Sequence, residues 1–180
     1  MLSGSDLYKQ HKNTENSLIE AKEKISLQSK QTPSLPPQKD GDIGVSFETG
    51  EAIGILEIPK LKAELPIIAG TNEDDLEKGV GHYTGTVLPG QPDQILLSGH
   101  RDTVFRRLGE LENGDTFHII MPYGEYTYEI INSQIVDALD PTIIKSTAPT
   151  ETLTVSTCYP FSYIGSAPYR YVLHAHRKGS

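Results

Sequence analysis

The sequence contains no tryptophan and only one cysteine, Cys158, in 180 residues. A single cysteine excludes a disulfide within the chain, and it excludes zinc or iron–sulfur sites built from several cysteines. A lone cysteine is either a small buried apolar residue or a nucleophile. The residues around Cys158 must therefore decide between these two roles.

Long hydrophobic runs are also lacking, since no stretch approaches the ~18 apolar residues that would cross a bilayer. The first residues lack the basic segment and apolar stretch of a signal peptide. Basic residues are scarcer than acidic ones, 16 against 24, and the formal net charge is −8. This balance argues against a nucleic-acid-binding protein, because phosphate backbones are bound by clustered Lys and Arg.

Two segments of different composition divide the chain. Residues 5–30 are rich in Lys, Glu, Gln and Asn with a thin apolar stripe, which predicts a weakly anchored, mobile helix. The run from Thr32 to Pro37 is a stiff, extended proline-rich linker. We therefore assign residues 1–44 to a helical stalk and linker, and residues 45–178 to a catalytic domain.

The domain has the composition of an all-β protein, with short β-rich runs between Gly and Pro turns. Two short helices interrupt the runs, one over Asn72–Lys78 capped by Thr71 and one near Val104–Leu108 capped by Thr103. The predicted strands are Ala52–Ile58, Leu65–Ala69, Gln94–Ser98, Thr116–Met121, Tyr126–Asp137, Thr152–Thr157 and Arg170–His176. A loop from Pro141 to Pro149 precedes the strand at Thr152, with room for one helical turn.

Cys158 stands at the end of one predicted strand, and Arg170 opens the next. The loop from Tyr159 to Tyr169 separates them. If the two strands pair as an antiparallel hairpin, the last residue of one lies beside the first residue of the other. Cys158 and Arg170 would then share one end of the sheet.

His100 follows another apolar strand, directly after Gly99. Strand ends are positions where a rigid scaffold presents functional groups. A thiolate, an imidazole and a guanidinium form a coherent set for acyl transfer. The thiolate attacks a carbonyl, the imidazole protonates the leaving amine, and the guanidinium donates to the developing oxyanion.

Three motifs resemble the sortase family. The run Thr154-Val155-Ser156-Thr157-Cys158 resembles the signature Thr-Leu-x-Thr-Cys, with Val in place of Leu. Arg170 matches the family's essential Arg, and Ser98-Gly99-His100-Arg101-Asp102-Thr103 matches its catalytic His segment. The stretches Gly79 to Tyr83 and Gly99 to Leu108 look most like class D sortases of Gram-positive bacteria.

The resemblance implies a closed eight-stranded β-barrel with short helices, preceded here by the N-terminal helix. It implies a membrane-anchored cysteine transpeptidase with His100, Cys158 and Arg170 as catalytic residues. We expect no cofactor and assign no metal site, and the sequence leaves any metal dependence open. Its substrates would be surface proteins with a C-terminal Leu-Pro-x-Thr-Gly-like signal, with Gly or Ala at the fifth position. The acceptor would be a cell-wall amine, usually on a peptidoglycan precursor.

The resemblance also implies a location, the outer face of the cell membrane of a Gram-positive bacterium. The family anchor is an N-terminal transmembrane helix, which this chain lacks, so we expect a soluble truncated form. The region Lys39 to Ile43 contains no Asp-Pro-aromatic plug of the kind that pilin-assembling class C sortases carry. We therefore expect an open groove.

Other polar residues have simpler explanations. Asp102 is either a helix cap or a carboxylate that orients His100, and we favour the cap. His174 and His176 share a strand face, but without a third ligand nearby, packing or hydrogen bonding is favoured over metal binding. His82 is expected to be structural. The acidic run from Glu73 to Asp75 is explained as a helix N-terminus rather than a calcium site.

Two alternatives to the transpeptidase are left open by the sequence. One is a cysteine peptidase that uses the same residues and transfers its acyl group to water. The other is a non-catalytic β-barrel that binds ligands on the cell surface, for which Cys158→Ala would change no activity.

Overall fold

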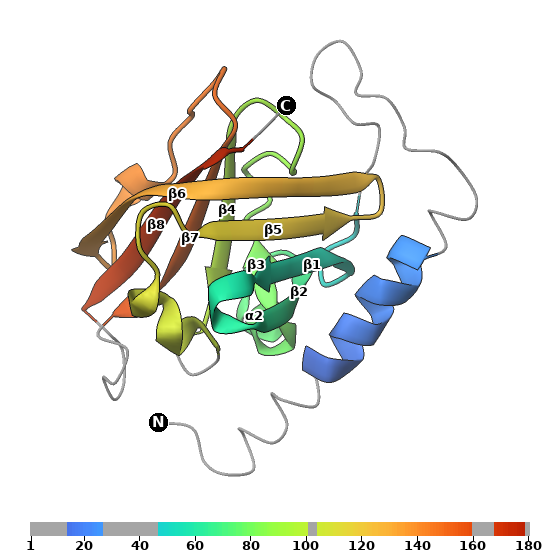
Figure 1. The fold of residues 1–180 in the computed structure, drawn as a ribbon. Helices are drawn as coiled ribbons and strands as arrows, with labels where there is room; N and C mark the ends of the chain where they lie inside the picture. The colour runs from blue at the N-terminus through green and yellow to red at the C-terminus, as the bar shows by residue number, and fades with distance from the viewer. Residues whose placement is uncertain (1–13, 27–46, 101–103, 160–167, 179–180) are drawn as a thin grey trace.

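The computed structural model describes residues 14–26, 47–100, 104–159 and 168–178 (Figure 1). The strands are β1 (Ala52–Ile58), β2 (Ala63–Ala69), β3 (Val80–His82), β4 (Gln94–Gly99), β5 (Thr116–Met121), β6 (Gly124–Asp137), β7 (Thr152–Tyr159) and β8 (Tyr169–Arg177). The helices are α2 (Glu73–Lys78), the 3-10 turns η1 (Pro59–Leu61), η2 (Val104–Glu110) and η3 (Pro141–Ile143), and a helix of residues 14–26.

The strands close into a barrel in the order β1-β2-β3-β4-β7-β8-β6-β5. Two neighbouring pairs, β2 with β3 and β4 with β7, are parallel, and the others are antiparallel. The expected all-β, eight-stranded barrel is therefore confirmed. A closed barrel leaves no unpaired sheet edge along its wall.

Strand β3 is the one strand that the sequence patterns did not reveal. It has three residues, and its middle residue is Gly81, so it offers no alternating signal. A Cβ atom at Gly81 would lie 2.4 Å from the carbonyl oxygen of Gly70. The glycine thus permits a close backbone approach that any side chain would block.

The barrel interior is filled by the inward-facing side chains of its strands. Alternation along each strand sends every second residue inward, so apolar residues recur with a period of two. The largest fully buried side chains of this interior are Tyr128, Phe117, Ile53, Leu56, Ile58, Ile67, Ile95, Leu97, Leu108 and Ile119. This packed core provides a rigid support for residues at the strand ends.

Helix α2 begins one residue later than its predicted cap implies. Asn72, not Thr71, is the N-cap, and its side chain accepts from the backbone N–H of Asp75 at 2.9 Å. The Asp75 carboxylate accepts in return from the N–H of Asn72, which completes a capping box. The prediction of Thr71 was wrong because the reciprocal bond fixes the boundary at Asn72. The predicted cap at Thr103 lies outside the described residues.

The helix of residues 14–26 packs on the outside of the barrel (Figure 1). Its fully buried Ala21 contacts an apolar cluster with Ala52 and Ile55 of β1 and Ile68 of β2. In barrel order β1 lies opposite β7. The thin apolar stripe of the helix therefore meets a matching apolar patch on the barrel wall, while its weak anchoring stays a prediction.

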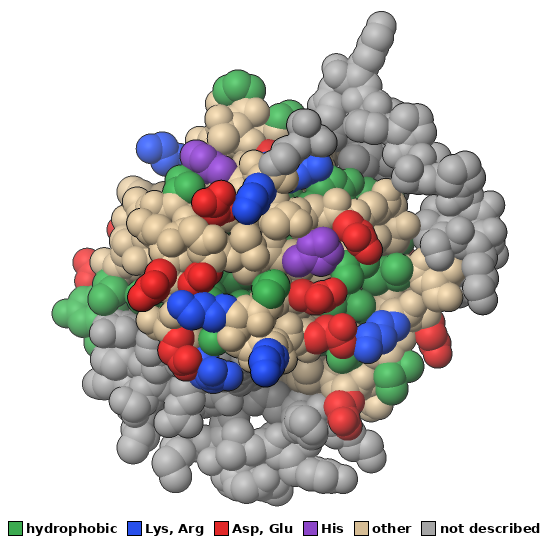
Figure 2. All heavy atoms as spheres, viewed as in Figure 1, with side chains coloured by type: hydrophobic (Ala, Val, Ile, Leu, Met, Phe, Trp, Pro, Cys, Tyr) green, Lys and Arg blue, Asp and Glu red, His purple; other side chains and the backbone are tan. Residues whose placement is uncertain are grey.

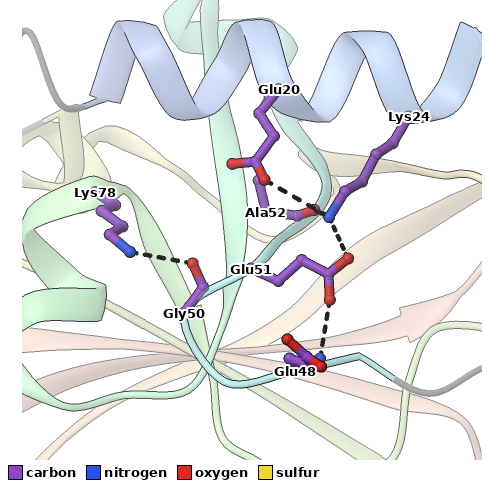
Figure 3. Close-up of polar contacts among 7 residues, drawn as sticks. All are labelled: Glu20, Lys24, Glu48, Gly50, Glu51, Ala52 and Lys78. Atoms are coloured by element: carbon purple, nitrogen blue, oxygen red, sulfur yellow. Dashed lines mark hydrogen bonds and ion pairs between the residues drawn. The ribbon is translucent and has the colours of Figure 1, made fainter.

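Polar contacts reinforce this helix (Figure 3). The ammonium group of Lys24 donates to the carbonyl oxygen of Ala52 at 2.8 Å and pairs with the carboxylate of Glu51. Burial raises the pKa of Glu51, but Lys24 and the N–H of Glu48 together hold this pKa below its ordinary value. The Glu51 carboxylate thus links the helix to the start of β1.

On the face shown in Figure 2, acidic and basic side chains are interspersed over β1, β5 and β6. Such a mixed surface does not form the single-sign basic field that attracts nucleic acid. Within the described part of the chain, no helix combines the length and apolar character needed to cross a membrane.

Candidate active site

The parallel pairing of β4 and β7 aligns two of the predicted site positions. Ser98 pairs with Ser156, and Gly99 pairs with Thr157. His100 follows Gly99, and Cys158 follows Thr157, so both positions come directly after the last paired residues. The Thr157 hydroxyl donates to the carbonyl oxygen of Gly99 at 2.9 Å and fastens the two strand ends together.

The antiparallel pairing of β7 and β8 adds the third position. Cys158 and Arg170 are register partners, as the predicted hairpin requires. His100, Cys158 and Arg170 therefore come from three neighbouring strands and meet at one end of the barrel. His100 and Arg170 are both half-buried.

The guanidinium group of Arg170 reaches to both neighbours of β8. Its Nε donates to the carbonyl oxygen of Ala138, just past β6, at 3.2 Å. Its Nη1 donates to the hydroxyl oxygen of Ser156 on β7 at 3.4 Å. These two bonds use two of the five N–H donors that a guanidinium carries.

Ser156 and Thr157 lie on opposite faces of β7, as strand alternation predicts. Val155, on the face of Thr157, belongs to the barrel core. Ser156 shares the outer face with Thr154, yet both are fully buried. The chain between β6 and β7 covers this face, and η3 in that chain is the single helical turn that the sequence predicted.

Gln94, a residue that the sequence analysis did not single out, holds that covering segment in place. Its buried amide nitrogen donates to the carbonyl oxygen of Ile143 at 2.6 Å and to the Thr154 hydroxyl at 3.2 Å. Its amide oxygen accepts from the N–H of Lys145 at 2.9 Å. A glutamine that opens an apolar strand run was the signal that could have pointed to this role.

Asp93 adds a second anchor for the same segment. Its carboxylate accepts from the N–H of Thr147 at 2.8 Å and from the Ser146 hydroxyl at 3.0 Å. Burial raises the pKa of Asp93, but the hydrogen bonds from Thr147, Gln94 and Ser146 outweigh it and keep this pKa low. The segment is thus tied to the start of β4 by two neighbouring side chains.

The outer face of the sheet continues this polar network to β8 and β6. The amide nitrogen of Gln134 contacts His174 Nε2 at 3.1 Å, and His174 Nδ1 contacts the Thr154 hydroxyl at 3.2 Å. Because the Gln134 amide is a donor, Nε2 accepts and Nδ1 carries the proton. Burial, aided by His176, lowers the pKa of His174 and favours this neutral form. Hydrogen bonding, which the sequence analysis favoured for His174, is confirmed.

A surface hollow of about 650 Å³ lies beside Arg170. Ala138, whose carbonyl oxygen accepts from Arg170, is part of its lining, and Ala138 N–H also donates to the carbonyl oxygen of Pro168 at 3.0 Å. The full lining is Asp137, Ala138, Leu139, Asp140, Pro141 and Pro168. The Leu139 side chain is 93% exposed there, so an apolar surface stands open next to the site.

The remaining candidates take structural positions where the structure describes them. His82 is buried, its Nε2 donates to the carbonyl oxygen of Val87 at 2.7 Å, and burial lowers its pKa. Its predicted structural role is confirmed. Asp102 lies outside the described residues. Among the residues that are described, no three His, Cys, Asp or Glu side chains are grouped to hold a metal ion.

Comparison with known proteins identifies the family of the chain. Residues 56–178 match the Sortase domain family, which is more than half of the chain. The chain belongs to the sortase family. Sortases are cysteine transpeptidases, and this sortase is an enzyme of that type with the sequence character of class D.

Two curated relatives support the class. Sortase D of Bacillus subtilis is 51% identical over 166 residues, covering 91% of this chain and 84% of that protein. Sortase SrtE1 of Streptomyces coelicolor is 32% identical over 133 residues, covering 64% of this chain and 38% of that protein.

Solved structures agree in fold. The catalytic domain of Bacillus anthracis SrtD has a TM-score of 0.64 and 42% identity, covering 75% of this chain and 92% of that one. A Clostridium perfringens Sortase D5 transpeptidase has a TM-score of 0.77, covering 93% and 99%. Its 24% identity makes it a guide to the fold alone.

Proposed function

We propose that this sortase cleaves a Leu-Pro-x-Thr-Gly-like sorting signal after Thr, with Gly or Ala at the fifth position, and transfers the Thr carbonyl to a cell-wall amine. Cys158 is the nucleophile, His100 the general acid and base, and Arg170 the donor to the oxyanion. The observation that carries the proposal is the meeting of these three positions at one end of β4, β7 and β8.

The first half of the reaction makes a thioester. The Cys158 thiolate attacks the Thr carbonyl carbon, and the carbonyl oxygen becomes an oxyanion that Arg170 stabilises through N–H donors. The tetrahedral intermediate then breaks its C–N bond. Protonated His100 gives its proton to the leaving amine, which departs with the C-terminal part of the signal.

The second half regenerates the enzyme. Neutral His100 takes a proton from the incoming amine as its nitrogen attacks the thioester carbonyl. The second tetrahedral intermediate expels the Cys158 thiolate and leaves a new amide bond. The charges match the start, because His100 is again protonated and Cys158 again a thiolate.

Two features of the surface around the three site positions support the binding of an extended peptide there. The covering segment between β6 and β7 is fixed to the barrel by Gln94 and Asp93, so it can form a defined wall. The hollow next to Ala138, which accepts from Arg170, combines apolar Leu139 and two prolines with the carboxylates of Asp137 and Asp140. Ligand sites commonly combine an apolar wall with a few placed polar groups.

We further propose that the enzyme acts at the outer face of the cell membrane of a Gram-positive bacterium, on surface proteins. Residues 1–44 would serve as the stalk and linker, and residues 45–178 as the catalytic domain. The helix of residues 14–26 packs on β1 and β2, and β1 lies opposite β7 in the barrel, which supports separate roles for the two parts of the chain.

The test is mass spectrometry of Leu-Pro-x-Thr-Gly and Leu-Pro-x-Thr-Ala peptides incubated with the enzyme and excess triglycine or diaminopimelate. Cys158→Ala, His100→Ala and Arg170→Ala variants run in parallel. His176→Ala and Arg107→Ala are matched controls, because both side chains are exposed and neither is one of the three proposed site residues. The proposal expects a Thr–amine ligation product that is lost in the three site variants and kept in both controls.

Three other outcomes would each decide a separate part of this proposal. Cleavage without ligation by any amine would overturn transfer and favour a peptidase. Ligation that persists in Cys158→Ala would overturn the nucleophile. Turnover of one peptide but not the other would establish the fifth residue of the signal.

A further inference from the structure

We infer that Ser156 is a positioning residue for Arg170, acting together with the main chain of Ala138. The inference rests on the proposed catalytic role of Arg170. Ser156 occupies the variable position of the Thr-Leu-x-Thr-Cys signature, two residues before Cys158, so the signature itself assigns it no role.

The geometry of the guanidinium group carries the inference. Arg170 pairs with Cys158 on β7 and with Val136 on β6, so its side chain starts between the two strands. Nε donates to Ala138, just past β6, and Nη1 donates to Ser156 on β7, so the guanidinium group is held from both neighbouring strands. A planar group held at two points has its orientation fixed, and its other N–H donors are aimed by that orientation.

Ser156 is well suited to this role because it is fully buried. A buried hydroxyl cannot exchange Arg170 for bulk water, so the bond stays with the protein. The Ser156–Arg170 distance of 3.4 Å is at the long end of the range for such bonds. Catalytic hydrogen bonds in an enzyme without substrate are often long and tighten in the complex.

Loss of the Ser156 bond should therefore destabilise the transition state of the reaction. The oxyanion forms only during the reaction, so an Arg170 that points elsewhere costs rate rather than substrate affinity. The Ser156→Ala variant should therefore lower kcat about tenfold, as expected for losing a hydrogen bond to a charged group, with KM for the sorting peptide unchanged. Ser133→Ala is the matched control, because Ser133 is exposed on β6.

Two measurements separate positioning from a general structural role. In the Arg170→Lys background, which keeps a measurable rate, Ser156→Ala should cost much less than tenfold, since the guanidinium group it acts through is gone. The ¹⁵N-labelled Nε–H signal of Arg170 should exchange with solvent faster in Ser156→Ala than in the unaltered chain. This second readout needs no activity, so it is independent of the kinetic comparison.

The outcomes are distinct. An unchanged kcat together with an unchanged Arg170 Nε–H signal in Ser156→Ala would overturn the inference while leaving the proposed function intact. An equal loss of kcat in both backgrounds would mean that Ser156 acts through folding rather than through Arg170. Full activity of Arg170→Ala would instead overturn the catalytic assignment of Arg170, and the inference with it.

Discussion

Cys158 and Arg170 are cross-strand partners at the ends of β7 and β8. Partners in an antiparallel pair have their Cβ atoms ~5 Å apart, so a guanidinium at this position is within reach of chemistry at the thiol. The pairing depends only on the hairpin register. It is therefore as rigid as the barrel that the two strands complete.

Replacing Arg170 with Lys should test whether the fork of donors matters beyond the charge. Lysine keeps the positive charge but offers one nitrogen, which cannot contact Ala138, Ser156 and an oxyanion together. We expect kcat to fall by about 100-fold, a typical loss for one oxyanion donor. Steady-state kinetics of peptide ligation measure this, and Arg107→Lys is the control. Wild-type kinetics would show that charge alone suffices.

Gln94→Leu should loosen the segment between β6 and β7. The variant removes the bonds to Ile143 and Lys145 and leaves the Thr154 hydroxyl with one donor fewer. We expect the free energy of unfolding to fall by about 2 kcal/mol, faster hydrogen exchange at the Lys145 amide, and a higher KM for the sorting peptide. Gln134→Leu is the control, since Gln134 is exposed and contacts Nε2 of His174 rather than the segment between β6 and β7. Unchanged exchange at Lys145 would contradict the anchoring role.

Glu151 should be important for stability rather than catalysis. Its carboxylate accepts from Tyr128, from Arg177 at 2.8 Å and from the N–H of Gly90 at 2.9 Å. Glu151→Ala would leave the buried Tyr128 hydroxyl and the Arg177 charge without this partner, costing about 3 kcal/mol. Urea denaturation measures the loss. Glu151 precedes β7, ~20 Å along the chain from Cys158, so kcat of the folded variant should not change.

His82 should make stability depend on pH near neutrality. Burial holds the pKa of His82 below its ordinary value of 6.5, so the unfolded chain binds a proton more readily than the folded one. The contribution of neutral His82 is complete above pH 6.5 and is lost as the pH falls towards the folded pKa. We expect the free energy of unfolding to drop between about pH 7 and pH 5, and to drop less in His82→Gln. Equal pH slopes in the two proteins would count against it.

Lys24→Ala should release the N-terminal helix without affecting turnover. The variant removes the pair with Glu51 and the bond to Ala52, so exchange of the amides in residues 14–26 should accelerate (Figure 3). The global loss should be at most about 1 kcal/mol, because the pair is partly exposed. Lys22→Ala, which removes a more exposed pair with Glu64, is the control. A fall in kcat would show that the helix communicates with the site.

The same contact should weaken in acid. The folded pKa of Glu51 lies below its ordinary value of 4.5, so its stabilisation is present above pH 4.5 and is lost as the pH falls through the folded pKa. Hydrogen exchange of the helix, measured from pH 6 to about pH 3, should show this loss in the unaltered chain and not in Lys24→Ala.

The sequence alone determined the local features of this protein. Alternating apolar residues marked most of the strands, because a period of two is a local property of the chain. The hairpin between β7 and β8 was equally accessible, since its strands are close in sequence. The pairing of Cys158 with Arg170 therefore follows from the order of residues along the chain.

Only the tertiary structure decided the rest. The parallel pairing of β4 with β7 joins residues 58 positions apart, as in the Thr157–Gly99 bond, and no local pattern encodes such a pairing. The same holds for the anchoring by Gln94, for the bond from Arg170 to Ser156, and for the helix of residues 14–26 on the wall opposite β7. These depend on which surfaces meet when the barrel closes, and that is a property of the whole chain.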